Sequence, residues 1–349
     1  MPLCYNGNMN LHPAKFWDSI GEGKVRCNLC RFRCVINDTR RGRCGVRENR
    51  AGQLFSLVYG KTIAENVDPI EKKPLYHFHP GSRSLSLATV GCNFRCLHCQ
   101  NYQISQWPHE RSGIPGTELS PQEVVRHAMD SGSASIAYTY TEPTIYFEYA
   151  YDTAVKARAS GIKNVFVTNG YTTTEALESI APYLDAANVD LKGFSDQAYR
   201  EVTGASLAGV LDCLRDYRRL GIWLEVTTLV IPGHNDSEDE LRQIACFIAE
   251  ELGRNVPWHI SAFYPTYKML DRPPTPMSTL SLARDLGHRA GLEYVYLGNV
   301  NEAGAGDTLC PGCGQTVIHR QRLQFIGTEL SDNRCSHCQY EIAGVALGA

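Results

Sequence analysis

Three cysteines, Cys92, Cys96 and Cys99, have the spacing C-x3-C-x2-C and follow directly on an apolar stretch at residues 84–90. Three thiolates at this spacing can ligate three irons of a 4Fe-4S cluster. Since no fourth cysteine follows nearby, the fourth iron would be open to another ligand. The spacing therefore predicts a reactive iron centre, and the alternative is a zinc site that takes a distant fourth ligand.

Two further sets of four cysteines flank this triplet, with the spacings C-x2-C-x3-C-x9-C and C-x2-C-x21-C-x2-C. They are Cys27, Cys30, Cys34 and Cys44, and Cys310, Cys313, Cys335 and Cys338. The C-terminal spacing is typical of a zinc ribbon, with a rubredoxin-like iron as the competitor. The N-terminal set offers four sulfurs to zinc, our first interpretation, or to an auxiliary iron–sulfur cluster; spacing alone does not separate the two. We interpret Cys213 and Cys246, in helix-like runs, as small buried hydrophobes.

Composition indicates an enzyme-sized protein with a large core, since 43% of its 349 residues are hydrophobic and 20% are charged. The net charge of -3 argues against a nucleic-acid partner, although residues 24–50 are locally basic. Such a patch is a solvated face, or else it binds a polyanion or an acidic partner. No stretch is apolar enough to span a membrane, and the N-terminal residues lack an export signal. We therefore expect a cytoplasmic protein whose thiols stay reduced.

Short apolar runs rich in β-formers alternate with amphipathic helical stretches between residues 84 and 298. Strands are expected at 84–90, 134–138, 164–168, 186–191, 223–231, 258–262 and 293–297, and helices at 121–129, 144–160, 173–183, 207–220 and 237–251. This alternation predicts a parallel sheet covered by helices. The cysteine triplet then lies in the loop after the first strand, at the carboxyl edge where α/β proteins place their chemistry.

Other polar residues follow the next strands at the same edge: Glu142 after the second, Thr168 and Asn169 after the third, and Asp190 and Lys192 after the fourth. Each is a weak signal alone, because Asn-Gly is a common turn and Glu-Pro a common helix start. Their repetition at successive strand ends indicates one site. Alternatively, Glu142 is a favourable charge at a helix N-terminus, and Asp190 and Lys192 pair with neighbours.

These motifs together carry a family resemblance. The triplet with His98 before its last cysteine, the Glu-Pro motif at Glu142, Thr-Asn-Gly at 168–170 and Asp-Leu-Lys at 190–192 resemble the radical S-adenosylmethionine (SAM) superfamily, in its glycyl-radical-activase-like branch. Residues 68–78 and the flanking cysteine sets are most similar to the radical SAM family of the AmmeMemoRadiSam system. The resemblance covers nearly the whole chain from about Cys27 onward.

The resemblance implies an α/β fold, an incomplete (β/α) TIM-like barrel with small N- and C-terminal cysteine-rich metal-binding modules. We divide the chain into an N-terminal four-cysteine module at 1–60, a connector at 61–82, the barrel at 83–300 and a zinc-ribbon-like module at 301–349. Zinc is the expected metal of the C-terminal module.

The resemblance also implies roles for single residues. Cys92, Cys96 and Cys99 would ligate the cluster, and its open iron would bind the methionine part of SAM. Glu142 matches the position that binds the cofactor's amino group, and Asp190 and Lys192 match positions near its carboxylate. The remaining expected cofactor contacts are Thr168, Asn169, His98 and His259. The two histidines would pack against adenine, and a satisfied strand-end histidine is the alternative for His259.

The implied activity is reductive cleavage of SAM to a 5′-deoxyadenosyl radical, which takes a hydrogen atom from an unidentified substrate. A reductant such as flavodoxin or ferredoxin and a Memo-like protein are the implied partners. Activation of a glycyl radical enzyme is the first alternative. Against it, Val167 stands where activases can carry an acidic residue of a cation site, and Thr141 where related sequences carry Gly or Asn. A non-catalytic zinc-binding adaptor is the second alternative.

Overall fold

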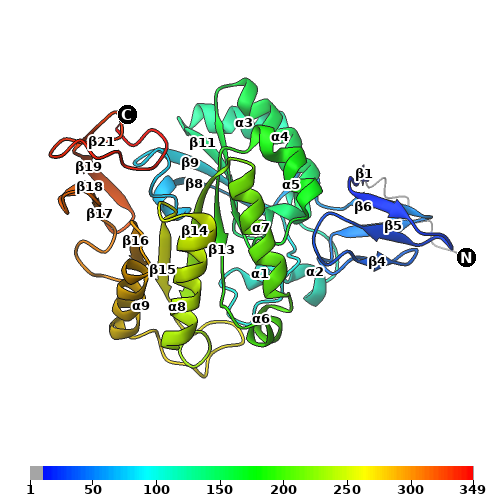
Figure 1. Ribbon diagram of the computed structural model, residues 1–349. Helices are drawn as coiled ribbons and strands as arrows, with labels where there is room; N and C mark the ends of the chain where they lie inside the picture. The colour runs from blue at the N-terminus through cyan, green and yellow to red at the C-terminus, as the bar shows by residue number, and fades with distance from the viewer. Residues whose placement is uncertain (1–10, 349) are drawn as a thin grey trace, which may run out of the picture.

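An open, mostly parallel sheet forms the centre of the computed structural model, which describes residues 11–348 (Figure 1). Its eight strands follow the order β16-β15-β14-β13-β12-β11-β9-β8, and only β8 runs antiparallel to its neighbour. The strands are β8 (Ala64–Pro69), β9 (Arg83–Ala88), β11 (Ser135–Tyr138), β12 (Lys163–Thr168), β13 (Ala186–Asp190), β14 (Trp223–Val230), β15 (Trp258–Ala262) and β16 (Val295–Gly298). The prediction of an incomplete (β/α) barrel is confirmed.

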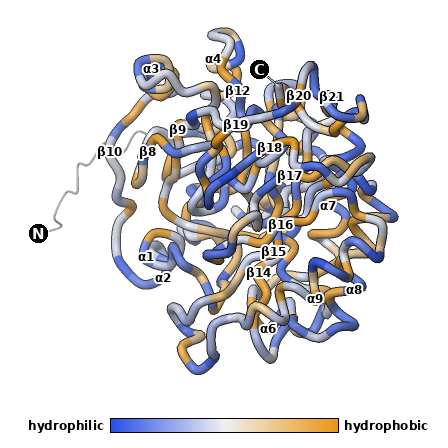
Figure 2. The backbone as a smooth tube through the Cα atoms, turned by 90° about the vertical axis from the view of Figure 1, so that its left-hand side faces the viewer, coloured by the Kyte–Doolittle hydropathy of each residue, from blue (hydrophilic) through white to orange (hydrophobic). Residues whose placement is uncertain are grey.

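Helices connect successive strands of this sheet and cover one of its faces (Figure 1). They are α3 (Pro121–Asp130), α4 (Phe147–Ala159), α5 (Thr174–Ile180), α6 (Asp196–Thr203), α7 (Leu207–Arg219), α8 (Glu238–Phe247) and α9 (Met277–Arg289). Helix α3 begins with a capping box formed by Ser120 and Glu123. Hydrophilic and hydrophobic residues alternate along α8 and α9 in Figure 2, as expected of helices with one buried side. Helices α6 and α9 were not predicted from the sequence.

The segment before β9 belongs to the main sheet, because it forms the edge strand β8. This strand pairs with β9, where Asp68 faces Ser84 in register. After β8 the chain turns across the inner face of the sheet. Three side chains of this turn, Ile70, Leu75 and Phe78, form one buried cluster with Ala137, Val165 and Ala186 of β11, β12 and β13. The segment that the sequence assigns to a connector therefore closes one end of the barrel.

The N-terminal module consists of two small antiparallel sheets, with the strand orders β1-β6-β5 and β2-β3-β4. The strands are β1 (His12–Pro13), β2 (Trp17–Ser19), β3 (Val25–Cys27), β4 (Val35–Ile36), β5 (Arg47–Arg50) and β6 (Gln53–Ser56). Its basic residues are largely neutralised within the chain, since ion pairs involve Arg31, Arg33, Arg41, Arg47 and Arg50. The part of this module that falls on residues 1–10, including Cys4, lies outside the described residues.

The C-terminal module lies beside β16, on the opposite side of the barrel from the N-terminal strands (Figure 1). Its strands are β17 (Thr308–Leu309), β18 (Thr316–Gln321), β19 (Gln324–Thr328), β20 (Leu330–Ser331) and β21 (Arg334–Cys335). Arg320 donates to the carbonyl of Tyr76 over 2.6 Å, and His77 Nδ1 lies 2.6 Å from the carbonyl of Ala343. The module thus packs on the turn that closes the barrel. Among the described residues, no helix has the length and apolar character that crossing a membrane requires.

Candidate functional site

The loop after β9 carries the three partly buried cysteines Cys92, Cys96 and Cys99. The amides of Arg95 and Leu97 donate to carbonyl groups at the end of α6, over 2.9 and 3.0 Å. The amide of Phe94, whose side chain is fully buried, approaches Cys92 Sγ at 3.4 Å. Backbone contacts therefore hold the cysteine loop at the carboxyl edge of the sheet.

Glu142 follows β11, and hydrogen-bond donors surround its carboxylate. Oε1 accepts from the amide and hydroxyl of Thr144 over 3.0 and 2.6 Å and from the Thr168 hydroxyl over 2.8 Å. Oε2 accepts from the amide of Asn169 over 2.8 Å. Burial raises the pKa of Glu142, and these hydrogen bonds oppose the rise. Glu142 caps the 3-10 helix Pro143–Tyr146, as one interpretation of the sequence proposed, and also joins the ends of β11 and β12.

Asn169 connects this carboxylate to the cysteine loop. Its Nδ2 donates to Asn93 Oδ1 over 2.8 Å and lies 3.8 Å from Cys92 Sγ. Burial raises the pKa of the Cys92 thiol, and the charge of Glu142 adds to the rise. The structure thus brings together the residues after β9, β11 and β12 that the sequence placed at one edge. Asn93 was missed by sequence reasoning, because only its position inside the cysteine motif distinguishes it.

Asp190 and Lys192 form an ion pair of 2.7 Å beside the same loop. Burial would lower the pKa of Lys192, but the charges of Asp190 and of Cys96 outweigh it and raise that pKa. Burial raises the pKa of Cys96 to about 12, while Lys192 opposes the rise. Asp190 and Lys192 therefore pair with each other, as the alternative interpretation of the sequence held. Lys192 also places a positive charge next to the cysteine loop.

His259 lies on β15, in register with Thr227 of β14, which is in turn in register with Asp190 of β13. Its Nε2 lies 2.6 Å from Glu225 Oε2, and both side chains are buried. The ring of Tyr296 stacks on it at 5.2 Å. His259 is a satisfied strand histidine on the face that also carries Asp190. Sequence reasoning missed Glu225, whose one signal is a charge inside an apolar run.

A second carboxylate that sequence reasoning left without a role, Asp68, lies on β8. It accepts hydrogen bonds from Lys72, Lys73, Ser86 and Tyr140 over 2.7 to 2.8 Å. Burial would raise the pKa of Asp68, but the two lysines and the tyrosine outweigh it and lower that pKa. Tyr140, two residues before Glu142, has a φ of 61°, which is unusual for a residue other than glycine. Asp68 therefore links β8 to the end of β11.

Comparison with known proteins decides the family. The radical SAM superfamily model matches residues 86–245. An uncharacterized protein of Methanocaldococcus jannaschii is 45% identical, over 95% of this chain and 99% of that protein. The chain belongs to the radical SAM superfamily. The pyruvate formate-lyase-activating enzyme of Clostridium pasteurianum is 24% identical over 48% of this chain and 70% of its own length. A solved radical SAM methyltransferase from Sphaerobacter thermophilus has a TM-score of 0.50 at 15% identity, over 68% of this chain and 71% of that one, which shows a shared fold.

Radical SAM proteins bind a 4Fe-4S cluster and SAM, and the polar atoms around the triplet fit such a ligand. Within residues 11–348, Asn93 Nδ2, Asn169 Oδ1 and both ring nitrogens of His98 are buried without a hydrogen-bond partner. Buried polar atoms are normally satisfied, so unpaired donors and acceptors here indicate a polar ligand. Burial and the nearby charge of Lys192 lower the pKa of His98 well below its usual range.

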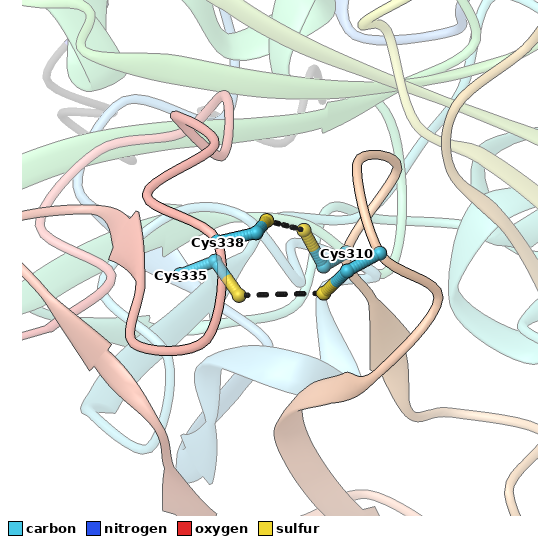
Figure 3. Close-up of side chains that lie close together, drawn as sticks. Cys310, Cys335 and Cys338 are labelled. Carbon is cyan, nitrogen blue, oxygen red and sulfur yellow. Dashed lines mark hydrogen bonds between the residues drawn. The ribbon is translucent and has the colours of Figure 1, made fainter.

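The C-terminal cysteines of this radical SAM protein approach one another closely (Figure 3). All four sulfurs lie within 4.8 Å of one another. Cys310 and Cys338 are 3.5 Å apart, and Cys313 and Cys335 are 3.7 Å apart. A tetrahedral zinc with Zn–S bonds of about 2.3 Å separates its sulfurs by about 3.8 Å. The C-terminal set therefore has the dimensions of a four-sulfur site for one metal ion.

The N-terminal cysteines have a different arrangement. Cys27, Cys30, Cys34 and Cys44 all line one cavity, together with residues that include Arg43 and Thr144. In the described part of the chain, no three of their sulfurs lie within 4.8 Å of one another. Burial raises the pKa of Cys44 to about 12. Four thiols around a cavity, two of them buried and two partly buried, are costly to ionise unless a metal compensates their charge.

Proposed function

We propose that this protein is a radical SAM enzyme that holds a 4Fe-4S cluster on Cys92, Cys96 and Cys99, with SAM beside it. When bound, the cluster and SAM supply reductive cleavage of the sulfur–C5′ bond and a 5′-deoxyadenosyl radical that takes a hydrogen atom from substrate. The observation that carries the proposal is the junction of Cys92, Asn169 and Glu142, because it places unpaired buried polar atoms next to the cysteine loop.

The chain's own residues bind and orient the cofactor. Glu142 holds Asn169 by its amide, so that Asn169 Oδ1 can accept a hydrogen bond from an ammonium group while Asn93 Nδ2 donates to a carboxylate. Lys192 provides a positive charge for the carboxylate. We assign His98, whose ring nitrogens have no partner among the described residues, to the adenine. His259 keeps this assignment as a prediction only, since Glu225 and Tyr296 already contact its ring.

The substrate that we propose is polar. Asp190, Thr227 and His259 form one row across β13, β14 and β15, and Asp68 adds an ionised carboxylate on β8. A surface with these groups would bind a substrate that offers hydrogen bonds or charge of its own, and would leave an apolar substrate poorly matched. The residues that reach the substrate are expected among this row.

The proposed partners, the metal of the C-terminal module and the place of work rest on the family and on the cysteine sets. A low-potential reductant such as flavodoxin or ferredoxin would supply the electron, and a Memo-like protein is the further partner that the sequence resemblance suggests. The C-terminal module would hold one zinc ion. Cysteines that ligate clusters and zinc must stay reduced, so the proposed place of work is the reducing cytoplasm.

Activation of a glycyl radical enzyme is the second candidate, favoured by the similarity to an activating enzyme. It predicts that the protein, SAM and a reductant generate a glycyl radical in a partner enzyme. Anaerobic incubation with pyruvate formate-lyase, followed by electron paramagnetic resonance (EPR), tests it: a doublet on the partner supports activation, whereas 5′-deoxyadenosine without a doublet on this partner favours a different substrate.

The test of the first proposal is production of 5′-deoxyadenosine. Protein purified without air is reduced in the presence of SAM, and wild type is compared with Cys96→Ala. Cys246→Ala is the matched control, because Cys246 lies in α8 outside the three cysteine sets. We expect product from wild type and from the control and none from Cys96→Ala. Absence of iron and of product in wild type would instead support the zinc-binding adaptor.

A further inference from the structure

We propose that Cys27, Cys30, Cys34 and Cys44 ligate a second 4Fe-4S cluster, and that this cluster passes electrons to the SAM cluster. The existence of the second cluster is independent of the proposed function, whereas its role as a relay rests on it. Four cysteine ligands would complete the coordination of all four irons, so this cluster would transfer electrons without binding SAM.

Sulfur spacing distinguishes this set from a zinc site. The irons of a 4Fe-4S cluster hold their cysteine sulfurs about 6 Å apart, whereas zinc draws four sulfurs to about 3.8 Å. The C-terminal set has the zinc spacing. Within residues 11–348, neither the N-terminal set nor the triplet has three sulfurs within 4.8 Å. Neither set therefore has the zinc spacing, and the four N-terminal cysteines line one common cavity.

The N-terminal set lies directly against the loop of the triplet. Arg43 Nε donates to the carbonyl of Asn93 over 3.1 Å. A Cβ on Gly91, the residue before Cys92, would lie 3.0 Å from the carbonyl oxygen of Cys44. Cys44 of the N-terminal set and Cys92 of the triplet therefore each lie next to a residue of the Arg43–Asn93 contact. Thr144, which donates to Glu142, also lines the N-terminal cavity.

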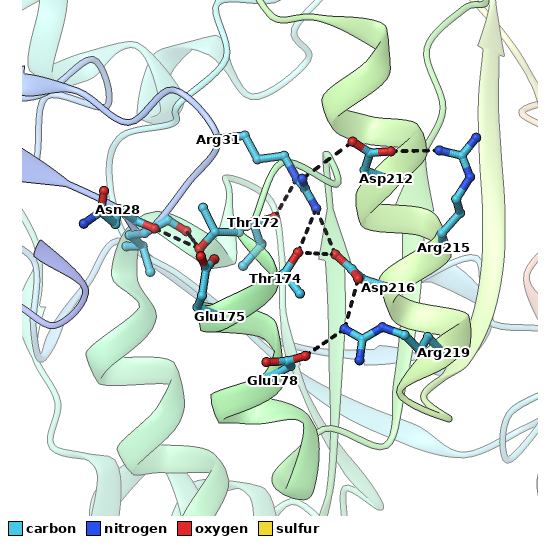
Figure 4. A network of polar contacts seen from close by, with 12 residues as sticks. Asn28, Arg31, Thr172, Thr174, Glu175, Glu178, Asp212, Arg215, Asp216 and Arg219 are labelled. Carbon is cyan, nitrogen blue, oxygen red and sulfur yellow. Dashed lines mark hydrogen bonds and ion pairs between the residues drawn. The ribbon is translucent and has the colours of Figure 1, made fainter.

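The module is fixed in this place by buried and partly buried ion pairs. Arg47 donates to Glu148 of α4 over 2.9 Å, and both side chains are almost fully buried. Arg31, next to Cys30, extends between α5 and α7, where it contacts Thr174 and pairs with Asp216 at 2.9 Å (Figure 4). A fixed separation between two redox centres is what an electron relay requires.

The electron step is a simple transfer. With a cluster held by Cys27, Cys30, Cys34 and Cys44, one electron would pass from a reduced ferredoxin or flavodoxin to that cluster and on to the SAM cluster. Each cluster would gain one electron and lose it again, and no covalent bond of the N-terminal module would form or break.

Metal content decides between the two kinds of site. Full-length protein is reconstituted with iron and sulfide without air, and iron, sulfide and zinc are quantified. The variants are the triplet variant, with alanine in place of all three loop cysteines, the double variant Cys30→Ala/Cys34→Ala, and the control Cys246→Ala. We expect about eight irons and about one zinc per chain in wild type and control, and about four irons in each variant.

EPR of the reduced proteins separates the two proposals. SAM should change the signal of the double variant and leave that of the triplet variant unchanged, while wild type should show a signal broadened by coupling between neighbouring clusters. About four irons and about two zincs in wild type, with no iron in the triplet variant, would overturn the second cluster. Eight irons without any SAM effect would contradict the proposed function and leave the second cluster standing. The wild-type count does not depend on whether a variant folds.

Discussion

The N- and C-terminal cysteine modules lie at opposite ends of the barrel strands and differ in both sulfur spacing and neighbours. The N-terminal set surrounds a cavity and contacts the triplet loop through Arg43 and Asn93. The C-terminal set forms a tight group and packs on the turn around Tyr76, where the strands begin. Four cysteines in a short module are thus compatible with two roles. The N-terminal set contacts the triplet loop, which suits the proposed electron relay. The C-terminal set lies on the turn around Tyr76, away from that loop, which suits a structural metal.

The largest expected difference between the modules is in turnover. Cys30→Ala/Cys34→Ala should lower 5′-deoxyadenosine formation by about 100-fold, which is about 2.7 kcal/mol of barrier, because electrons lose their route. The corresponding C-terminal variant, Cys313→Ala/Cys338→Ala, should lose less than about threefold per folded chain, since its site lies far from the loop. The measurement is product per folded chain with reduced ferredoxin as the donor.

Dithionite provides the control for that comparison. A small chemical reductant can reach the SAM cluster without the relay, so it should restore part of the activity of the N-terminal variant. Equal losses in both double variants with ferredoxin would contradict the division of roles.

Each terminal module has one buried arginine whose substitution should lower the free energy of unfolding. Arg47→Met leaves Glu148 buried without its partner, and Arg320→Met leaves Glu71 and the Tyr76 carbonyl uncompensated. Each should lower the free energy of unfolding by about 3 to 5 kcal/mol, measured by denaturant unfolding. Only Arg47→Met should also change the EPR signal of the triplet cluster.

The matched control for these arginines is Arg33→Met. Its pair with Glu175 is exposed, with side-chain exposures of 49% and 61%, so its loss should cost less than about 1 kcal/mol. An EPR change in Arg320→Met as large as that in Arg47→Met would show that the triplet responds to general loosening, and would weaken the comparison.

The sequence predicted the parallel part of the sheet because its strands are apolar runs of normal length. It missed β8, whose sequence Ala-Glu-Asn-Val-Asp-Pro lacks a hydrophobic pattern and which forms by pairing with β9. It also missed α9, where small and polar residues dilute the apolar spacing. Local pattern is thus informative for buried elements and much less so for edges.

The residues of the candidate site also fall into a group that local sequence predicts and a group that it does not. Motif spacing identified the cysteines, Glu142 and Asn169, because each follows a strand directly. The pairs Glu225 with His259 and Asp68 with Lys73 depend on contacts between separate strands or turns, which no local pattern encodes. The choice of metal in the N-terminal module could not be predicted and stays a proposal, since spacing along the chain does not give spacing between sulfurs.

The pH dependence of stability should report how the C-terminal module packs on the turn around His77. His77 is buried between Ala343 and Tyr296, and burial lowers its pKa to about 4. The unfolded chain binds a proton below about pH 6.5, whereas the folded chain does so only below about 4. Stability from His77 is therefore complete above pH 6.5 and is lost as the pH falls, by up to about 3 kcal/mol.

His77→Asn should flatten this slope between about pH 4 and 6.5 in denaturant unfolding at constant zinc content, and His319→Asn, at a partly exposed histidine of the same module, should not. A wild-type slope that survives in His77→Asn would place the titrating group elsewhere.

The smallest expected effect tests the contact between the N-terminal module and the triplet. Gly91 has a φ of +100°, and a Cβ there would lie 2.7 Å from Val46 Cγ1. Gly91→Ala should therefore cost about 1 to 2 kcal/mol in backbone strain and push the module away from the loop. Gly113, with a φ of +80° and no atom within 4 Å of its Cβ position, controls for the strain alone. The measurement is the EPR coupling between the two clusters in variants that keep their iron. Weaker coupling than in wild type for Gly91→Ala, but not for Gly113→Ala, would show that the close contact sets the relay. Equal coupling in both variants would place the clusters too far apart for this loop to matter.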